Sequence, residues 1–182
     1  TIGNHANQIL ELKTWLQERM NWMNTYLSNY QACSDPDIPS LVISKINYNP
    51  SSSTEFASDD LEFIEITNNS NQTVSLTGVY FSEPGLSYQF PANSIIKAHC
   101  AIFLASNSSA FRQHYGFTPF GQYTRNLSNK SQLLVLADGY GSVIDLVKYF
   151  DTTPWPTEAD GKGSYLKLIN LNYDNNNASS WI

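Results

Sequence analysis

The side chains best suited to acid–base, metal or nucleophilic chemistry are few and scattered. The three histidines, His5, His99 and His114, lie far apart in the sequence and match no pattern of zinc ligands. Serine is common, but no Gly-x-Ser-x-Gly motif places a serine on the sharp turn that many hydrolases use. We therefore predict no catalytic residue and no enzyme activity.

The carboxylates form neither an acid–base pair nor a calcium-binding loop. Glu62 and Glu65 are three residues apart in an expected strand, so their side chains point to opposite faces and are assigned structural roles. Asp59, Asp60 and Asp138 lie in expected loops and lack the spacing of an EF-hand. We interpret them as turn and capping residues and predict no bound metal.

Two pairs of glycines, Gly139-x-Gly141 and Gly161-x-Gly163, do not open a helix after a strand, as a dinucleotide-binding loop would. Both pairs indicate turns, and we predict no cofactor.

Aromatic residues, which make up 13% of the chain, are the better guide to binding. Most of them must fill a hydrophobic core. Trp155, which lies between Pro154 and Pro156, and Tyr140, at the expected tip of a hairpin, are candidates for exposed rings that stack on a sugar or anchor a protein. We predict Tyr140 and Trp155 as binding residues, the alternative for Trp155 being that it covers the core.

Two explanations fit the two cysteines, Cys33 and Cys100. A disulfide would tie the end of the expected N-terminal helix to the following unit and stabilise the fold by about 4 kcal/mol. Two buried thiols are the preferred alternative, because residues 100–104 have the apolar content of a core strand.

Composition excludes two classes of partner. The chain has 182 residues and a net charge of −6. An acidic balance without a basic stripe argues against nucleic-acid binding, which needs clustered Lys and Arg. No apolar run approaches the roughly 20 residues that cross a bilayer, so we predict no membrane-spanning segment.

The sequence divides into two units. The first thirty residues predict one amphipathic helix, whose apolar stripe consists of Ile9, Leu12, Leu16, Met20, Met23, Leu27 and Tyr30. Pro36 and Pro39 end this pattern. We expect a helical segment over residues 1–36, the tail of an upstream domain, and a second unit over residues 38–182. Because residue 1 is threonine, we also expect the chain to be part of a longer product.

Beyond Pro39 the apolar period changes to two, which predicts β-strands. The expected strands are residues 41–48, 61–68, 79–82, 100–105, 132–137, 143–149 and 165–168, with weaker candidates at 74–76 and 88–90. This spacing is typical of an antiparallel sandwich or barrel. A hairpin turn is expected over 138–142, and a short helix capped by Ser109 over 109–115. Residues 61–66 break the alternation, so either both faces of that strand are covered or a bulge near Phe63 switches them.

These segments, taken in order, resemble a lamin-tail domain, especially its bacterial versions. The resemblance rests on residues 41–50, 62–68, 74–81, 133–138, 144–149, 154–156, 160–166 and Trp181. It covers about residues 40–182 and implies an immunoglobulin-like antiparallel β-sandwich. With the long N-terminal α-helix expected above, the predicted fold is mainly β. That helix resembles the final helix of a spore-coat-protein-H-like (CotH) kinase domain, on Ile9, Leu12, Lys13, Trp15, Leu16, Arg19 and Met20.

Together these observations favour a non-catalytic interaction or spacer module of a bacterial extracellular or envelope protein. Its partner would be a protein or a cell-surface glycan, bound through the loops at the ends of the sandwich. Few lysines and many neutral polar residues favour a location outside the cell or in its envelope. The alternatives are a carbohydrate- or calcium-assisted adhesion module and an accessory domain of an upstream CotH-like kinase.

Overall fold

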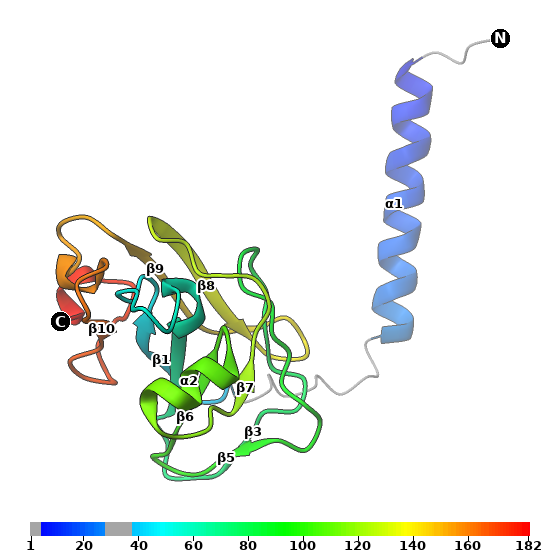
Figure 1. Ribbon diagram of the computed structural model, residues 1–182. Helices are drawn as coiled ribbons and strands as arrows, with labels where there is room; N and C mark the ends of the chain where they lie inside the picture. The colour runs from blue at the N-terminus through cyan, green and yellow to red at the C-terminus, as the bar shows by residue number, and fades with distance from the viewer. Residues whose placement is uncertain (1–4, 28–37) are drawn as a thin grey trace. The chain divides into compact units, whose positions relative to one another are not determined.

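The computed structural model describes residues 5–27 and 38–182 and divides into two compact units, residues 1–37 and 38–182. The first unit contains helix α1 (His5–Leu27), and the second contains all of the described strands (Figure 1). The predicted N-terminal helix is therefore confirmed over the residues that the structure describes. Tyr30, the last residue of the predicted stripe, lies outside them.

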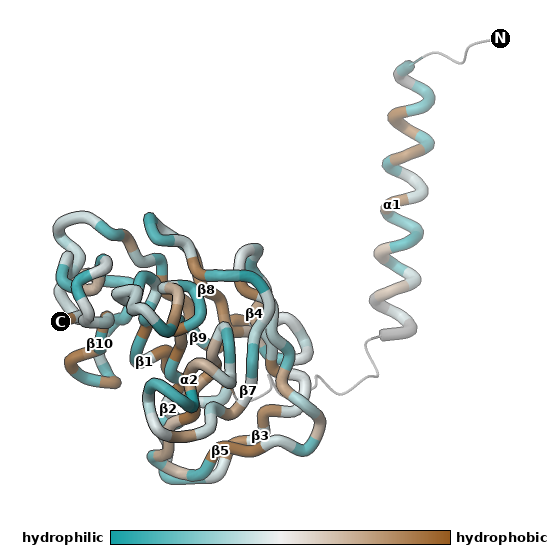
Figure 2. The backbone as a smooth tube through the Cα atoms, viewed as in Figure 1, coloured by the Kyte–Doolittle hydropathy of each residue, from teal (hydrophilic) through white to brown (hydrophobic). Residues whose placement is uncertain are grey.

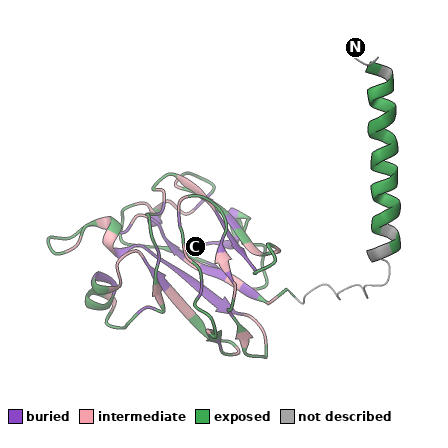
Figure 3. Ribbon diagram, turned by 90° about the vertical axis from the view of Figure 1, so that its right-hand side faces the viewer, coloured by how far each residue is buried: buried purple, intermediate pink, exposed green. Residues whose placement is uncertain are grey.

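Helix α1 exposes every side chain that the structure describes (Figure 3). Apolar and polar residues alternate along it (Figure 2). The exposed apolar side chains of the predicted stripe are Ile9, Leu12, Leu16, Met20 and Met23. The Arg19 guanidinium lies 4.4 Å from the ring centroid of Trp22, as a cation–π contact one turn along the helix. Among the described residues, neither α1 nor any other helix combines the length and apolarity needed to cross a bilayer.

The second unit is an immunoglobulin-like β-sandwich, as predicted. Its five-stranded sheet has the order β10-β1-β2-β6-β7, made of β1 (Leu41–Asn47), β2 (Phe63–Asn68), β6 (Ala101–Ala105), β7 (Gly121–Gln122) and β10 (Leu166–Lys167). Its three-stranded sheet has the order β4-β8-β9, made of β4 (Tyr80–Phe81), β8 (Ser131–Ala137) and β9 (Val143–Phe150). A two-stranded ribbon joins β3 (Val74–Ser75) and β5 (Ile95–Ile96).

One hydrophobic core is shared by the two larger sheets. Its fully buried strand residues include Ile43, Ile46, Ile64, Ile66, Leu104, Leu134, Leu136 and Val147. The rings of Tyr48 and Tyr149 stack within it, with centroids 4.8 Å apart. Figure 3 shows these buried strands surrounded by more exposed loops. Removing this apolar surface from water, at about 25 cal/mol per Å², is the main source of stability.

Strand β2 has both faces covered, which explains why its sequence does not alternate. All six of its residues are buried. Ile64 and Ile66 belong to the main core, whereas Phe63 belongs to a second cluster with Phe111 of helix α2 (Ser108–Tyr115). The Phe63 and Phe111 rings meet edge to face, with centroids 5.8 Å apart. Of the two explanations that the sequence allowed, coverage of both faces is correct.

Several details differ from the expectations. Asn107, rather than Ser109, caps α2, because the Asn107 Oδ1 atom accepts hydrogen bonds from the amides of Ser109 and Ala110. Register shifts lie between Ile43 and Lys45 of β1 and in the β8–β9 pair at Leu136 and Ala137, not near Phe63. Strand β7 runs parallel to β6, so the sheet is not purely antiparallel. The two-residue strands β5 and β7 were not predicted, whereas the equally short β3, β4 and β10 lie within the predicted segments 74–76, 79–82 and 165–168.

Cys100 is not the buried thiol that the sequence indicated. It is exposed and carries a free thiol. Its amide donates to the carbonyl of Lys97, which places Cys100 in a turn that ends just before β6 begins. Cys33 lies outside the described residues.

Candidate functional site: a groove beside strand β9

Tyr140 lies at the tip of the β8–β9 hairpin, as the sequence predicted. The Asp138 Oδ1 atom accepts hydrogen bonds from the amides of Tyr140, at 2.9 Å, and Ser142, at 2.8 Å. Gly141 supplies the positive φ, 87°, that closes the turn. The turn holds the Tyr140 ring 85% exposed, so this side chain is available to a partner.

Trp155 is not an exposed platform; of the two alternatives that the sequence left open for it, coverage of the core is correct. Only 6% of it is exposed, and it belongs to the main core. Its ring centroid lies 6.0 Å from that of Trp181, which comes from the C-terminal segment. The flanking prolines correctly indicate an irregular segment, but the covering partner is distant in sequence. Burial of such a large apolar ring outweighs its loop position.

The structure does not bring Tyr140 and Trp155 together. Tyr140 precedes β9 and Trp155 follows it, and an eight-residue strand spans about 23 Å. Two hollows, however, lie along β9 between these two residues.

The first hollow, here called the Phe150 hollow, opens where β9 ends and has a volume of about 500 Å³. Its lining consists of Phe150, Thr152, Thr153, Pro154, Trp155, Asn176, Asn177 and Ala178. The Phe150 side chain is 38% exposed. The volume lies within the roughly 300–1,000 Å³ of small-molecule sites.

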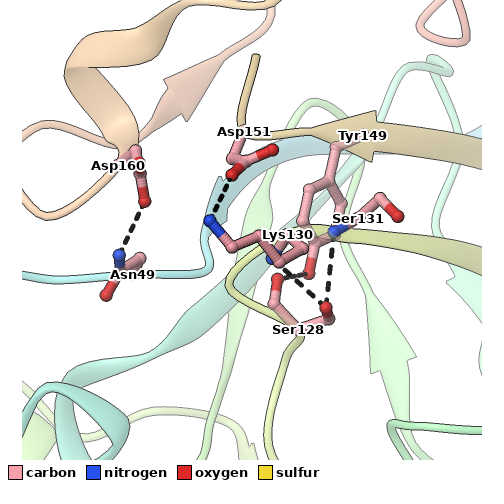
Figure 4. Close-up of polar contacts among 7 residues, drawn as sticks. All are labelled: Asn49, Ser128, Lys130, Ser131, Tyr149, Asp151 and Asp160. Carbon is pink, nitrogen blue, oxygen red and sulfur yellow. Dashed lines mark hydrogen bonds and ion pairs between the residues drawn. The ribbon is translucent and has the colours of Figure 1, made fainter.

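Polar contacts join the end of β9 to the loop before β8 (Figure 4). The Lys130 Nζ atom lies 2.9 Å from the Oδ2 atom of Asp151, the residue that follows Phe150. The Tyr149 hydroxyl donates to the Ser128 carbonyl at 2.7 Å. Both contacts therefore anchor the end of β9 to one loop, residues 128–130.

The second hollow, here called the Asp145 hollow, lies beside the first half of β9 and has a volume of about 350 Å³. Its lining consists of Val143, Ile144, Asp145, Leu146, Asp174, Asn175 and Asn176. The Asp145 Oδ2 atom accepts from the Ile43 amide and from the Asn175 Nδ2 atom, both at 2.7 Å. Burial raises the pKa of Asp145 to about 6 in spite of these hydrogen bonds. This carboxyl group therefore connects β1, β9 and the loop over residues 174–177.

Asn176 lines both hollows, and the two hollows together are here called the β9 groove. The Asn176 Oδ1 atom accepts from the Lys148 amide at 2.9 Å, and the Leu146 amide donates to the Asp145 carboxylate. Both amides lie on the outer edge of β9, whose other edge pairs with β8. Side chains thus occupy the hydrogen-bonding positions that an added strand would need.

The two glutamates lie outside the groove and have structural roles. Glu62 is fully buried, and its Oε2 atom accepts from the Leu127 amide at 2.9 Å and the Tyr123 hydroxyl at 3.2 Å. Burial raises the pKa of Glu62 to about 8. Glu65 forms an ion pair with Lys45, whose Nζ atom lies 2.6 Å from the Glu65 Oε2 atom.

Within residues 5–27 and 38–182, no three His, Cys, Asp or Glu side chains are grouped closely enough to hold a metal ion. The loop carboxylates instead bind amide groups. Asp59 accepts from Asn126 at 2.6 Å, and Asp60 accepts from Asn107 at 3.0 Å. Asp138 has the turn role described above.

The comparisons with known proteins agree with this fold. A family model, Lamin Tail Domain, matches residues 34–151, whereas no match was found among curated proteins. Lamin tail domains are immunoglobulin-like, non-enzymatic interaction domains. Since the match covers well over half of the sequence, the chain belongs to the lamin tail domain family.

Proposed function

We propose that this chain is a non-catalytic interaction module of a bacterial extracellular or envelope protein, and that it holds a protein or surface partner in the β9 groove. The observation that carries the proposal is the groove itself, which runs along one strand of a rigid sandwich. Exposed apolar side chains, Leu146 and Phe150, lie along it, and the exposed ring of Tyr140 lies at the hairpin that leads into it. Loops and edges positioned by a sandwich are common binding surfaces.

The composition supports the proposed location. Charged residues make up only 14% of the chain, and neutral polar residues take their place. The proposal is tested by fractionating cells that make the protein and detecting it with an antibody. Recovery in the medium or envelope fraction is expected, and recovery with cytoplasmic markers alone would contradict the location.

The binding role is tested by screening the full chain against a displayed peptide library and a glycan array. Each ligand found is then measured with Phe150→Ala and Tyr140→Ala. Ile95→Ala is the matched control, because Ile95 is an exposed apolar residue of β5 that lines neither hollow. We expect the groove variants to weaken binding and the control to leave it unchanged. Ligands that respond only to the control, or no ligand from either screen, would contradict the proposal and favour a spacer.

An accessory role beside a CotH-like kinase is a second candidate, favoured by the exposed apolar residues of α1, among them Leu12 and Leu16. Such a surface fits a partner protein with a complementary apolar face. The test is a titration of a CotH-type kinase domain with the full chain, with Leu16→Glu and, as control, the polar exposed position Gln17→Glu. Binding that only Leu16→Glu abolishes is expected; no binding, or equal effects of both variants, would contradict this role.

A further inference from the structure

We infer that the Phe150 hollow of the β9 groove binds an uncharged saccharide; this inference rests on the proposed function and names the chemical class of the ligand. The groove offers two hollows of different chemistry. The Asp145 hollow contains two carboxylates, Asp145 and Asp174, whereas the Phe150 hollow has no ionisable side chain in its lining.

The uncharged lining selects against charged ligands. All eight lining residues of the Phe150 hollow are apolar, hydroxyl or amide residues, although the chain carries a net charge of −6. Lys148 places its Nζ atom 5.4 Å from the Phe150 ring centroid, and Lys130 pairs with Asp151, but none of these three charged residues lines the hollow. No side chain that lines the hollow therefore offers an opposite charge to a charged ligand, whereas a neutral ligand needs none.

The polar groups that line the hollow are neutral, and two of them are held in place by main-chain amides. The Asn176 Oδ1 atom is fixed by the Lys148 amide at 2.9 Å, and the Asn177 Oδ1 atom by the Ser179 amide at 3.1 Å. Each side chain keeps its amide NH₂ group, for which no acceptor is found among the described residues. The hydroxyl groups of Thr152 and Thr153 also line the hollow. Sugar hydroxyl groups both donate and accept, so they complement such a set.

An aromatic ring and a proline complete the site. Phe150, 38% exposed, and Pro154 present apolar surface beside these polar groups. The C–H faces of a pyranose ring pack on such surface while its hydroxyl groups reach the surrounding donors. The open hollow leaves the remaining hydroxyl groups in water, so their desolvation cost is small.

An extended peptide is the less favoured ligand. A peptide that adds to a sheet edge gains its affinity from main-chain hydrogen bonds. Along β9 the outward amides of Leu146 and Lys148 are already bonded to Asp145 and Asn176. A peptide strand would first have to displace both side chains, whereas a sugar in the Phe150 hollow displaces neither.

The inference is tested by titrating the full chain with lactose, cellobiose, maltose and N,N′-diacetylchitobiose, using ligand-observed NMR. Asn176→Asp and Asn177→Asp each keep the oxygen that accepts the structural hydrogen bond and remove the NH₂ donor. Asn170→Asp is the matched control, because Asn170 also accepts a main-chain hydrogen bond, from Asn172, but does not line the hollow. Phe150→Ala removes the apolar ring.

We expect at least one disaccharide to bind, about fivefold weaker binding for Asn176→Asp or Asn177→Asp, and about tenfold weaker binding for Phe150→Ala. Asn170→Asp and added EDTA are expected to change nothing. Equal effects of the three asparagine variants, or no binding of any of the four sugars, would overturn the inference. If no sugar binds but the peptides from the library screen bind more weakly to Phe150→Ala, the proposed function stands and only the saccharide inference fails. If Phe150→Ala weakens the binding of no ligand, the proposed function and the saccharide inference both fail.

Discussion

Replacement of the buried acid Glu62 by glutamine is expected to stabilise the fold at neutral and alkaline pH but not at acidic pH. Glu62 is fully buried, and burial raises its pKa from 4.5 to about 8. Its Oε2 atom accepts two hydrogen bonds, but its Oε1 atom is buried without a partner. Over the pH range between these two pKa values, Glu62 is therefore protonated in the folded state and ionised in the unfolded chain.

The sign and size of the effect follow from this difference in pKa. Because the folded pKa of an acid is raised, stability is complete below pH 4.5, falls as the pH rises, and reaches its lower limit above pH 8. At 1.36 kcal/mol per pKa unit the total loss is about 5 kcal/mol, of which about 3 kcal/mol has occurred by pH 7. Glutamine cannot ionise, so the Glu62→Gln variant lacks this loss. At pH 4.5 the protonated acid and the amide both place a buried donor at the unpartnered position, so their stabilities are similar.

The assay is urea unfolding, followed by tryptophan fluorescence, of both proteins between pH 4.5 and 8.5. The stability difference in favour of Glu62→Gln should grow steadily across this range. Glu158→Gln is the control, because the exposed Glu158 makes only a surface ion pair with Lys162. A difference that is constant with pH, or a Glu62→Gln variant that is less stable than the natural protein at pH 8, would refute the reasoning.

Three further predictions concern the loops. Asn107→Ala should lower the free energy of unfolding by about 1 kcal/mol, because it removes the cap of α2. Ser109→Ala should have little effect in the same thermal or urea assay. A larger loss for Ser109→Ala than for Asn107→Ala would contradict the cap assignment. Asp138→Ala should lower the free energy of unfolding by about 1 kcal/mol, and Asp138→Asn should lower it less, because asparagine keeps an acceptor for the turn amides. Equal losses for the two variants would contradict the turn role of Asp138. In a Cys33→Ser variant the remaining thiol of Cys100 should react with Ellman's reagent without denaturant, since it is exposed; reaction only after unfolding would show that it is buried.

The architecture of the second unit could be predicted because its long strands carry their own signal. Strands β1, β8 and β9 are apolar or alternating segments bounded by turn residues, and the β8–β9 turn depends on local interactions of Asp138 and Gly141. Strands β5 and β7 have two residues each, and their pairing depends on distant partners. Unlike the equally short β3, β4 and β10, they do not lie in a longer apolar or alternating segment that predicts a strand.

The candidate site could be predicted only in part, because much of it also depends on contacts between residues that are distant in sequence. Tyr140 is exposed because its own turn makes it so. The environment of Trp155 depends on Trp181, and the β9 groove exists because residues 174–178 return to β9. The raised pKa of Glu62 likewise results from burial in a core built by distant segments, against the opposing effect of the hydrogen bonds from Leu127 and Tyr123. These long-range contacts leave no pattern in any single segment.

The most direct test of the interaction role is a map of amide chemical shifts in ¹⁵N-labelled full-length chain, titrated with the tightest ligand from the peptide and glycan screens. The β9 groove predicts that the largest saturable shifts fall on residues 143–155 and 174–178. Shifts concentrated instead on the β3–β5 ribbon or on α2, with residues 143–155 unchanged, would contradict it.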